Sequence, residues 1–560
     1  MSATPVRPAL LPMGRTAFLL DLSEAPDPLA AVLDWHSDLL AHPEPGQVEA
    51  LAAARTVLVR FADAASAASA APRLPLRTPA AADAGQAREV RVETVYDGED
   101  LAEVARLIGL STEAVVEAHT GTPWRVAFGG FAPGFFYLAG GDPRLVVPRR
   151  DSPRTAVPAG SVALAGEFSA VYPRRSPGGW QLLGRTTAPL WDLDATPPAL
   201  LAPGDTVRFV AVREQATLTT PDKQAKPGEP AQQDQPHATT APALTVLDPG
   251  LRTLIQDGGR PYRGDLGVTA SGAADAPSAA QANRLVGNHP DAPVLETLLG
   301  GLALRAERNV VLALTGGVDE ATVTQANGAT HPVVPCAAFA LYAGETLTLN
   351  PPRAGLRGYV GLRGTLEVEP VLGSRSTDTL SGLGPAPLAA GDILSVAPPE
   401  PLGARRQEAT PATGAIAVGH PEAPATPLPA PGQTVVLRAS PGPRADWFGE
   451  EGAAALAAGS WVVGPQSDRV GARLTAAEGG APLTRSRQGE LASEGMVPGA
   501  VQVPPDGLPV VFLADHPVTG GYPVIAVVHP ADLALAAQLR PGTPVRFQIT
   551  TGTSTQGEPR

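Results

Sequence analysis

Apolar residues recur at helical spacing in the stretch DGEDLAEVARLIGLSTEAVVEAH (97–119). The first half of this stretch puts its apolar side chains on one helical face, formed by Leu101, Val104, Leu107 and Ile108. It is followed by Gly109, a residue typical of a helix end. We expect Asp100 to cap this helix, with Glu103 reaching back to it, and Ser111 to cap a second helix. The stretch therefore predicts two consecutive helices.

Other parts of the chain show the pattern of strands. Residues 1–95 mix short β-rich runs, TAFLLDL (16–22) and RTVLVRF (55–61), with Ala- and Leu-rich helical stretches, which predicts a small α/β domain. From 124 to 212 short apolar runs alternate with turn signals and little helix. This second pattern is typical of a barrel or sandwich.

Three landmarks occur twice along the chain in the same order. LLAPGDTVRFVAV (200–212) resembles QLRPGTPVRFQIT (538–550), and PLAAGDILSVA (387–397) is a weaker third version. In each of the first two copies, a glycine of an upstream turn precedes the glycine of the repeated motif. The separation is 44 residues from Gly160 to Gly204 and 43 residues from Gly499 to Gly542. A Gly-Gly-aromatic element, GGW or GGY, falls inside each interval. We infer duplicated β-barrels, three in number.

Two Pro-rich stretches divide the chain. The stretch from 214 to 242 is rich in Pro, Gln and Thr and cannot pack a core, so we expect a flexible linker. The predicted order is a small α/β domain (1–95), a barrel (96–213), the linker (214–242), a second barrel (243–407), a Pro/Ala-rich connection (408–433) and a third barrel (434–553).

Composition narrows the class of function. The 560 residues carry a formal charge of −13 and a pI of about 5.2, which disfavours nucleic-acid or anionic-membrane partners. Cys336 is the only cysteine, which excludes an intrachain disulfide, and no apolar run is long enough to span a membrane. We expect a soluble cytoplasmic protein.

The only lysines, Lys223 and Lys226, lie in the predicted linker. The folded parts therefore lack a lysine for a Schiff base, for biotin attachment or for a Walker-type phosphate loop. Arginine remains to bind carboxylates and phosphates through its planar fork.

Two arginine clusters precede barrel strands: Arg149, Arg150 and Arg154, and then Arg469 and Arg473. Prolines stiffen the first cluster, and a preordered loop loses less entropy on binding. Each cluster is either a solvated basic loop or an anion site.

A glycine-rich segment after residue 253 is dense in polar side chains. A carboxylate beside amides and arginine can position water or a metal, which makes Asp257, Asp275 and Glu296 candidate bases. Alternatively, Asp257 and Arg260 form only a turn salt bridge. Further polar groups occur in VLGSRST, a candidate anion nest, and in the segment that holds Gln502, Asp515 and His516. The motifs of serine and zinc hydrolases are absent from the sequence.

Long motifs resemble a known family, the multicomponent 5-oxoprolinases. FGGFAPGFFYLAGGDPRLVVPRRDSPRTAVPAGSVALAGEFSAVYPRRSPGGWQLLGRTTAPLWD resembles the B component of 5-oxoprolinase, also called allophanate hydrolase subunit 1. QDGGRPYRGDLGV, SGAAD, ANRLVGN, VLGSRST, QSDRVGARL, SEGMVPGAVQVPPDGLPVVFLAD and TGGYP resemble the C component, also called allophanate hydrolase subunit 2. The motifs follow one another in the right order, so the chain resembles a fused B–C pair.

The resemblance implies a mainly β protein with an α/β N-terminal domain and tandem cyclophilin-like β-barrels. It implies an ATP-dependent 5-oxoprolinase component that opens 5-oxo-L-proline to L-glutamate together with a separate polypeptide, the 5-oxoprolinase A component. ATP and Mg²⁺ are the expected cofactors, with no biotin on this chain, and the metal ligands and self-association remain open.

Site roles follow from the resemblance and the chemistry together. We expect Asp257 with Arg260 as a polarising pair, and Asp275 and Glu296 as bases or Mg²⁺ ligands. The expected substrate- or anion-binding residues are Arg149, Arg150, Arg154, Ser161, Trp180, Arg185, Gln256, Ser374, Arg375, Arg469, Arg473, Gln502 and Tyr522.

The chain departs from the family pattern at Ser169-Ala170, at Pro517-Val518 and after the GSRST motif, changes that can alter substrate preference. Two other interpretations stay open. The same modules form the carboxyltransferase region of urea carboxylase, and related stand-alone pairs resemble a histidine-kinase inhibitor and its antagonist.

Overall fold

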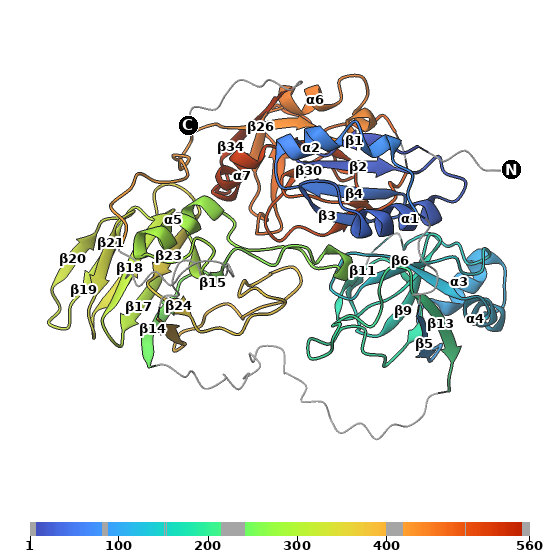
Figure 1. The fold of residues 1–560 in the computed structure, drawn as a ribbon, viewed down its shortest axis with the longest axis horizontal. Coiled ribbons are helices and arrows are strands. Elements are labelled where there is room, and N and C mark those ends of the chain that lie inside the picture. The colour runs from blue at the N-terminus through green and yellow to red at the C-terminus, as the bar shows by residue number, and fades with distance from the viewer. Residues whose placement is uncertain are drawn as a thin grey trace. The chain divides into compact units, whose positions relative to one another are not determined.

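The computed structural model describes residues 7–80, 88–150, 152, 154–213, 241–398, 418–487 and 489–550. These residues form two compact units (Figure 1). The first comprises Met1–Ala82, Phe128–Ala132 and Pro242–Arg560, and the second comprises Asp83–Ala127 and Pro133–Ala241. Residues 214–240 of the predicted linker and residues 408–417 of the predicted Pro/Ala-rich connection lie outside the described residues, whereas Pro242 begins a strand. Within the described residues, no helix has the length and apolar character needed to cross a membrane.

The first unit begins with a four-stranded antiparallel sheet in the order β1-β2-β4-β3. Its elements are β1 (Ala9–Pro12), β2 (Ala17–Asp21), α1 (Pro28–Ala41), β3 (Gln47–Ala52), β4 (Thr56–Phe61), α2 (Ala64–Ala70) and the short helix η1 (Leu74–Leu76). Asp27 and Asp63 cap the two helices with their side chains. One face of this sheet, with Leu19, Leu51 and Leu58, shares a buried core with Met496 and Phe512 of the C-terminal part.

The second unit holds seven strands in the order β12-β9-β10-β7-β6-β13-β5. A bridge between Val95 and Arg185 joins the two edges, so the sheet is nearly a closed barrel. Its strands are β5 (Glu89–Thr94), β6 (Trp124–Gly129), β7 (Phe136–Ala139), β9 (Ser161–Ala165), β10 (Phe168–Val171), β12 (Gln181–Arg185) and β13 (Thr206–Ala211), with β8 (Arg154–Val157) and β11 (Ser176–Gly178) as a separate pair. β5 pairs in parallel with β13, so it belongs to this barrel and not to the α/β domain that we placed at 1–95.

The two predicted helices of this unit are confirmed as α3 (Leu101–Ile108) and α4 (Thr112–Gly121). Gly109 ends α3 in the left-handed region, and Ser111 caps α4 through its hydroxyl. The predicted capping box at Asp100 is wrong. Its carboxylate binds arginines 150 and 154, and Glu103 pairs with an arginine of its own helix, because a cation is a stronger partner than a helix amide.

The middle of the chain forms two packed sheets around one apolar core, and not the closed barrel predicted for 243–407. The first sheet has the order β20-β19-β22-β17-β14-β25-β24 and the second the order β15-β16-β23-β18-β21. The elements are β14 (Pro242–Pro249), β15 (Thr253–Gln256), the short helix η3 (Gly264–Leu266), α5 (Ala276–Val286), β16 (Val294–Leu298), β17 (Leu302–Ala306), β18 (Val310–Gly316), β19 (Ala321–Thr324), β20 (Thr330–Val333), β21 (Ala338–Leu341), β22 (Thr346–Leu349), β23 (Arg357–Leu362), β24 (Thr365–Leu366) and β25 (Ile393–Ala397). Here the last strand, β25, runs antiparallel to the first strand, β14. In the second unit and in the C-terminal part of the chain, the last strand of the repeat runs parallel to the first.

The C-terminal part is a closed seven-stranded barrel, β26-β33-β30-β31-β28-β27-β34. Its elements are β26 (Val435–Pro441), the short helix η4 (Ala445–Phe448), α6 (Ala453–Ala458), β27 (Trp461–Val463), β28 (Gly471–Ala476), β30 (Ala500–Gln502), β31 (Val510–Phe512), β33 (Val524–Val528), α7 (Pro530–Ala537) and β34 (Pro544–Ile549), with β29 (Glu494–Gly495) and β32 (Thr519–Gly520) as a separate pair.

The closed barrel repeats the strand order of the second unit, which confirms two copies of the predicted duplication. In each copy the last strand is parallel to the first, and the landmark glycines Gly160, Gly204, Gly499 and Gly542 all have positive φ. Trp124 and Trp461 occupy matching positions at the start of β6 and β27. Each donates its indole N–H, at 3.0 Å, to the carbonyl five residues earlier. The protein is mainly β, as predicted, whereas the cyclophilin-like assignment stays a prediction.

Candidate active site

A cavity of about 310 Å³ lies within the first unit. Three parts of the chain line it: strands β3 and β4, the segment from 262 to 277, and the closed barrel with the start of α7. Most of the lining is apolar, and the polar side chains are few: Glu49, Arg60, Tyr262, Thr269, Ser271 and His516. This combination of an apolar wall and a few polar groups is typical of a small-molecule site.

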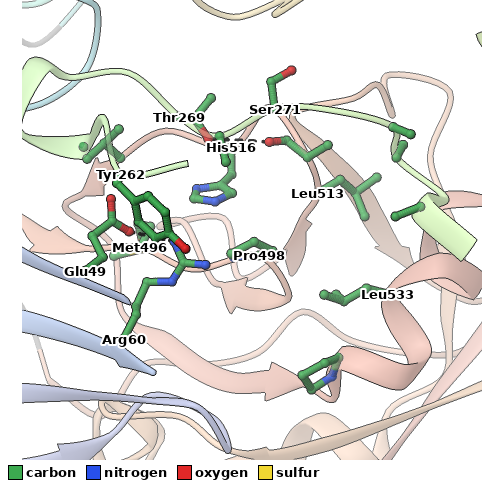
Figure 2. A pocket seen from close by; sticks show the side chains of 18 of the residues that line it. Glu49, Arg60, Tyr262, Thr269, Ser271, Met496, Pro498, Leu513, His516 and Leu533 are labelled. Atoms are coloured by element: carbon green, nitrogen blue, oxygen red, sulfur yellow. Dashed lines mark hydrogen bonds and ion pairs between the residues drawn. The ribbon is translucent and has the colours of Figure 1, made fainter. Parts of the chain in front are cut away.

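Arg60 provides the cationic side chain of the cavity. It extends from β4 into the cavity, which Tyr262 also lines (Figure 2). Its Nη1 donates to Glu49 Oε2 at 2.7 Å, and its side chain is 32% exposed. Because a guanidinium carries five N–H donors, the pair with Glu49 orients Arg60 and leaves donors for an anionic ligand.

His516 reaches into the cavity from the barrel (Figure 2). Its Nδ1 lies 2.8 Å from the carbonyl oxygen of Pro517, and its ring stacks on Phe512. Burial lowers the pKa of His516 to about 4, and the charge of Arg60 acts in the same direction. The imidazole is therefore neutral near pH 7.

A buried charge network lies directly behind the cavity wall. Ser271, a lining residue with φ of 53°, donates its hydroxyl to Asp515 Oδ1 at 2.6 Å. Asp515 also accepts Nε and Nη2 of Arg469 at 2.9 and 3.0 Å, and both the amide and the hydroxyl of Thr379. Burial favours the protonated acid, but these donors hold the pKa of Asp515 below its usual value.

Arg469 also donates to Glu296, so it links two carboxylates from different parts of the chain. Glu296 accepts the amide of Ala274 and the phenol of Tyr359, each at 2.9 Å. The Arg469 side chain is only 4% exposed. The guanidinium that we expected to bind a ligand anion is thus committed to internal carboxylates.

Asp257 is held by a serine pair, and Arg260 interacts with it electrostatically. Its carboxylate accepts Ser374 Oγ at 2.6 Å, Ser376 Oγ at 2.5 Å and the amide of Arg375 at 2.7 Å. Arg260 instead donates to the carbonyls of residues 371 and 376, and burial lowers its pKa. The VLGSRST motif therefore cradles a carboxylate of the protein itself.

Asp275 caps α5 and is saturated by donors. It accepts Ser278 through both amide and hydroxyl, the Thr426 hydroxyl and the Gln538 amide. Burial raises the pKa of Asp275. Because the oxygens of both Asp275 and Glu296 already accept protein donors, the pair does not fit the expected Mg²⁺ site. Among the described residues, no cluster of three or more His, Cys, Asp or Glu side chains is arranged to hold a metal.

The remaining predicted residues of the first unit do not line the cavity. Gln256 is buried and donates to the carbonyl of residue 377, and Gln502 donates to the carbonyl of Tyr522. The Tyr522 side chain is largely exposed, with the guanidinium of Arg485 over its ring. Arg473 is exposed on β28.

In the second unit the first arginine cluster is also paired internally. Arg150 Nη1 and Arg154 Nη2 lie 2.6 and 2.9 Å from Asp100 Oδ1, and Arg149 is exposed. Burial opposes ionisation of Asp100, but hydrogen bonds from Arg154 and the amide of Leu182 keep its pKa below the ordinary value.

The other predicted residues of this unit are dispersed. Ser161 is buried at the start of β9, and Trp180 is buried in an aromatic cluster with Phe135 and Tyr137. Arg185 pairs with Asp97 at the surface.

Sequence reasoning missed the polar residues that line the cavity from the N-terminal sheet. Arg60 interrupts the otherwise apolar run TVLVRF. A charged residue within an apolar strand was the feature of the sequence that could have marked it as a candidate site residue. Tyr262, Thr269 and Ser271 lie in the polar segment that we singled out, but among the polar lining residues only His516 was named individually.

Two family models match the chain. The model "Carboxyltransferase domain, subdomain A and B" matches residues 266–549, about half of the chain, and "Carboxyltransferase domain, subdomain C and D" matches residues 8–201. The chain belongs to the carboxyltransferase-domain family. It contains both matched segments in fused form.

Curated relatives follow the same division. The chain is 35% identical over 306 residues to the C component of 5-oxoprolinase from Escherichia coli, covering 54% of this chain and 90% of that protein. It is 46% identical over 130 residues to the B component of 5-oxoprolinase from Bacillus subtilis, covering 23% of this chain and 54% of that protein. The match to the B component thus spans about half the length of that relative. The N-terminal and C-terminal parts of the chain are homologous to the B and C components, respectively.

A solved structure shares the whole fold. The crystal structure of TTHA0988 is 37% identical, has a TM-score of 0.76, and the alignment covers 95% of this chain and 99% of that one. The fused arrangement therefore occurs in another protein of known structure.

Both family matches contribute to the cavity. Glu49, Leu51 and Arg60 lie in the subdomain C and D match, whereas Thr269 and His516 lie in the subdomain A and B match. Residues of both matched segments therefore line the cavity.

Proposed function

We propose that this chain is the fused B–C component of an ATP-dependent 5-oxoprolinase that works with a separate A component. The reaction opens the lactam of 5-oxo-L-proline to L-glutamate. Ring opening consumes one water, and hydrolysis of ATP to ADP and phosphate consumes a second. The homology to the B and C components of 5-oxoprolinase supports this assignment.

The observation that carries the proposal is the cavity built from both matched segments. A substrate site composed of both explains why the two modules are useful in one chain. The volume of about 310 Å³ lies at the small end of the roughly 300–1,000 Å³ typical of ligand sites, which suits a five-membered ring acid.

Arg60 is the residue that we assign to the substrate carboxylate. Its Nη1 is oriented by Glu49, and its remaining donors form a planar edge suited to a carboxylate. The five-membered ring would then contact the apolar wall, where Leu51, Val268 and Met496 exclude water.

The lactam needs activation because an amide is a poor electrophile. ATP enters the proposed reaction as a substrate that phosphorylates the lactam oxygen and leaves as ADP. Water then attacks the ring carbon and the ring C–N bond breaks, which gives an acyl phosphate. A second water releases phosphate from it and leaves L-glutamate. The role of this chain's own residues is to bind the ring acid and hold it away from bulk water. The phosphorylating and ring-opening groups are not assigned to particular side chains.

The test is glutamate formation from 5-oxo-L-proline and ATP by this chain mixed with the purified A component. Arg60→Met should raise the KM for 5-oxoproline by at least 10-fold, which corresponds to about 1.4 kcal/mol. Arg55→Met is the matched control, since Arg55 is exposed in the turn that precedes β4. An absence of glutamate above that from each polypeptide alone would refute the oxoprolinase assignment.

A further inference from the structure

The tautomer of His516 is fixed by its surroundings. The carbonyl oxygen of Pro517 can only accept a hydrogen bond, so Nδ1, which lies 2.8 Å away, must carry the proton. Stacking on Phe512, at an interplanar angle of 24°, sets the plane of the ring. In a neutral imidazole with Nδ1 protonated, Nε2 is an acceptor only.

The acceptor lies at the far end of the ring from the backbone, and the ring extends into the cavity (Figure 2). Burial lowers the pKa of His516 to about 4, which keeps the ring neutral and makes it a weak base near pH 7. Recognition of a hydrogen-bond donor therefore suits this imidazole better than proton abstraction.

Arg60 and His516 offer complementary chemistry to one ligand. Arg60 offers donors to an anion, and His516 offers a lone pair to a donor. Both side chains line the same cavity of about 310 Å³, so one small ligand can meet both. A carboxylate attached to the carbon next to a ring N–H provides both groups.

We propose that His516 is a specificity-determining residue that accepts a hydrogen bond from the ring N–H of the substrate. The inference rests on the proposed function for the identity of the ring acid. It adds that the cavity selects a lactam over a ring compound of the same shape that has no N–H. A ring oxygen at that position would place two lone pairs against each other and leave Nε2 buried without a donor.

The two residues that follow His516 in the chain lie at this same place. Pro517 supplies the carbonyl that orients His516, and Val518 lines the cavity. These two residues therefore influence the orientation of the proposed acceptor and the shape of the space beside it.

Two ring acids of nearly the same shape provide the test: 5-oxo-L-proline and the lactone 5-oxotetrahydrofuran-2-carboxylate, in which oxygen replaces the N–H. Their dissociation constants are measured by isothermal titration calorimetry on the full chain, alone and with the purified A component. We expect the lactam to bind at least 10-fold more tightly than the lactone.

Two variants separate the contributions. His516→Phe keeps an aromatic ring for the stack on Phe512 but removes the acceptor, so the preference should fall to within 2-fold. Arg60→Met should weaken both ligands by a similar factor and leave their ratio unchanged. If His516→Phe does not fold, His516→Gln, which retains an acceptor, should keep at least part of the preference.

The outcomes distinguish the two proposals. Equal binding of lactam and lactone to the wild-type chain would overturn the role of His516 and leave the proposed function intact, as would an unchanged preference in His516→Phe. Failure of both ligands to bind, with and without the A component, would overturn the proposed function and this inference together.

Discussion

Replacing Arg469 by methionine should destabilise the first unit strongly. In the native chain this guanidinium lies between Asp515 and Glu296 and also donates to the carbonyl of Gly272 at 2.5 Å. The substitution keeps most of the volume but leaves buried Asp515 without the guanidinium that pairs with it, whereas Glu296 keeps only its longer contact, 3.6 Å, with Arg357. Removing one partner of a buried ion pair typically costs about 3–5 kcal/mol. For a domain of this size that corresponds to a fall of roughly 10 °C in the melting temperature.

The assay is urea unfolding followed by tryptophan fluorescence, since Trp447 and Trp461 lie in the core of the closed barrel. Arg473→Met is the matched control because Arg473 is exposed on β28, and it should change stability by less than about 0.5 kcal/mol.

The loss of unfolding free energy in Arg469→Met, called the deficit below, should also depend on pH. Without the cation, burial raises the pKa of Asp515 above its unfolded value, so the folded variant takes up a proton as the pH falls. The deficit should therefore be smaller at pH 5 than at pH 8. A loss of less than about 1 kcal/mol at pH 8, or a deficit that grows at low pH, would refute the idea that Arg469 neutralises Asp515.

Three further predictions concern single buried groups. Burial lowers the pKa of His119 to about 3, below its unfolded value, so the stability that its neutral form provides is complete above about pH 6.5 and is lost as the pH falls toward 3. Unfolding of the wild-type chain should show this pH dependence, worth at most ~5 kcal/mol, and His119→Phe should lack it. Cys336 is buried and burial raises its pKa, so an aromatic disulfide reagent at pH 8 should label no thiol in the native chain within minutes and one thiol in urea; rapid native labelling would contradict this. Asp275→Ala removes the cap of α5 together with its contacts to Thr426 and Gln538, and should cost about 2–4 kcal/mol by thermal unfolding, whereas a change below 1 kcal/mol would show that the cap contributes little.

Local signals in the sequence predicted local structure well. The spacing of apolar residues, Gly109 and the Ser111 hydroxyl predicted two helices and their boundary, because all of these act within a few residues. The landmark glycines also predicted two equivalent barrels, since a turn that requires positive φ constrains the residue type.

Long-range pairing was harder to predict. β5 pairs with β13, which lies more than 100 residues later in the chain. The alternation of side chains in Glu89–Thr94 predicts a strand but does not specify which sheet that strand joins. The middle copy keeps the glycine landmark Gly391 but pairs its last strand in the opposite direction, so the landmark alone does not determine closure.

The candidate site shows the same limit. The arginines were correctly identified as chemically important, but the sequence does not tell whether a guanidinium meets a ligand or a carboxylate of the protein. Arg469 and Arg154 both meet internal acids that lie far from them in the chain. Arg60 became a candidate only when the fold placed its strand beside the barrel.

The central claim is that the cavity shared by the two matched segments binds 5-oxo-L-proline. A crystal structure of the chain soaked with 5-oxo-L-proline tests it most directly. We predict electron density for the ring acid in the cavity, with its carboxylate on Arg60 and its N–H within hydrogen-bond distance of His516 Nε2. An empty cavity with the ligand bound at another ordered site of the chain would contradict it.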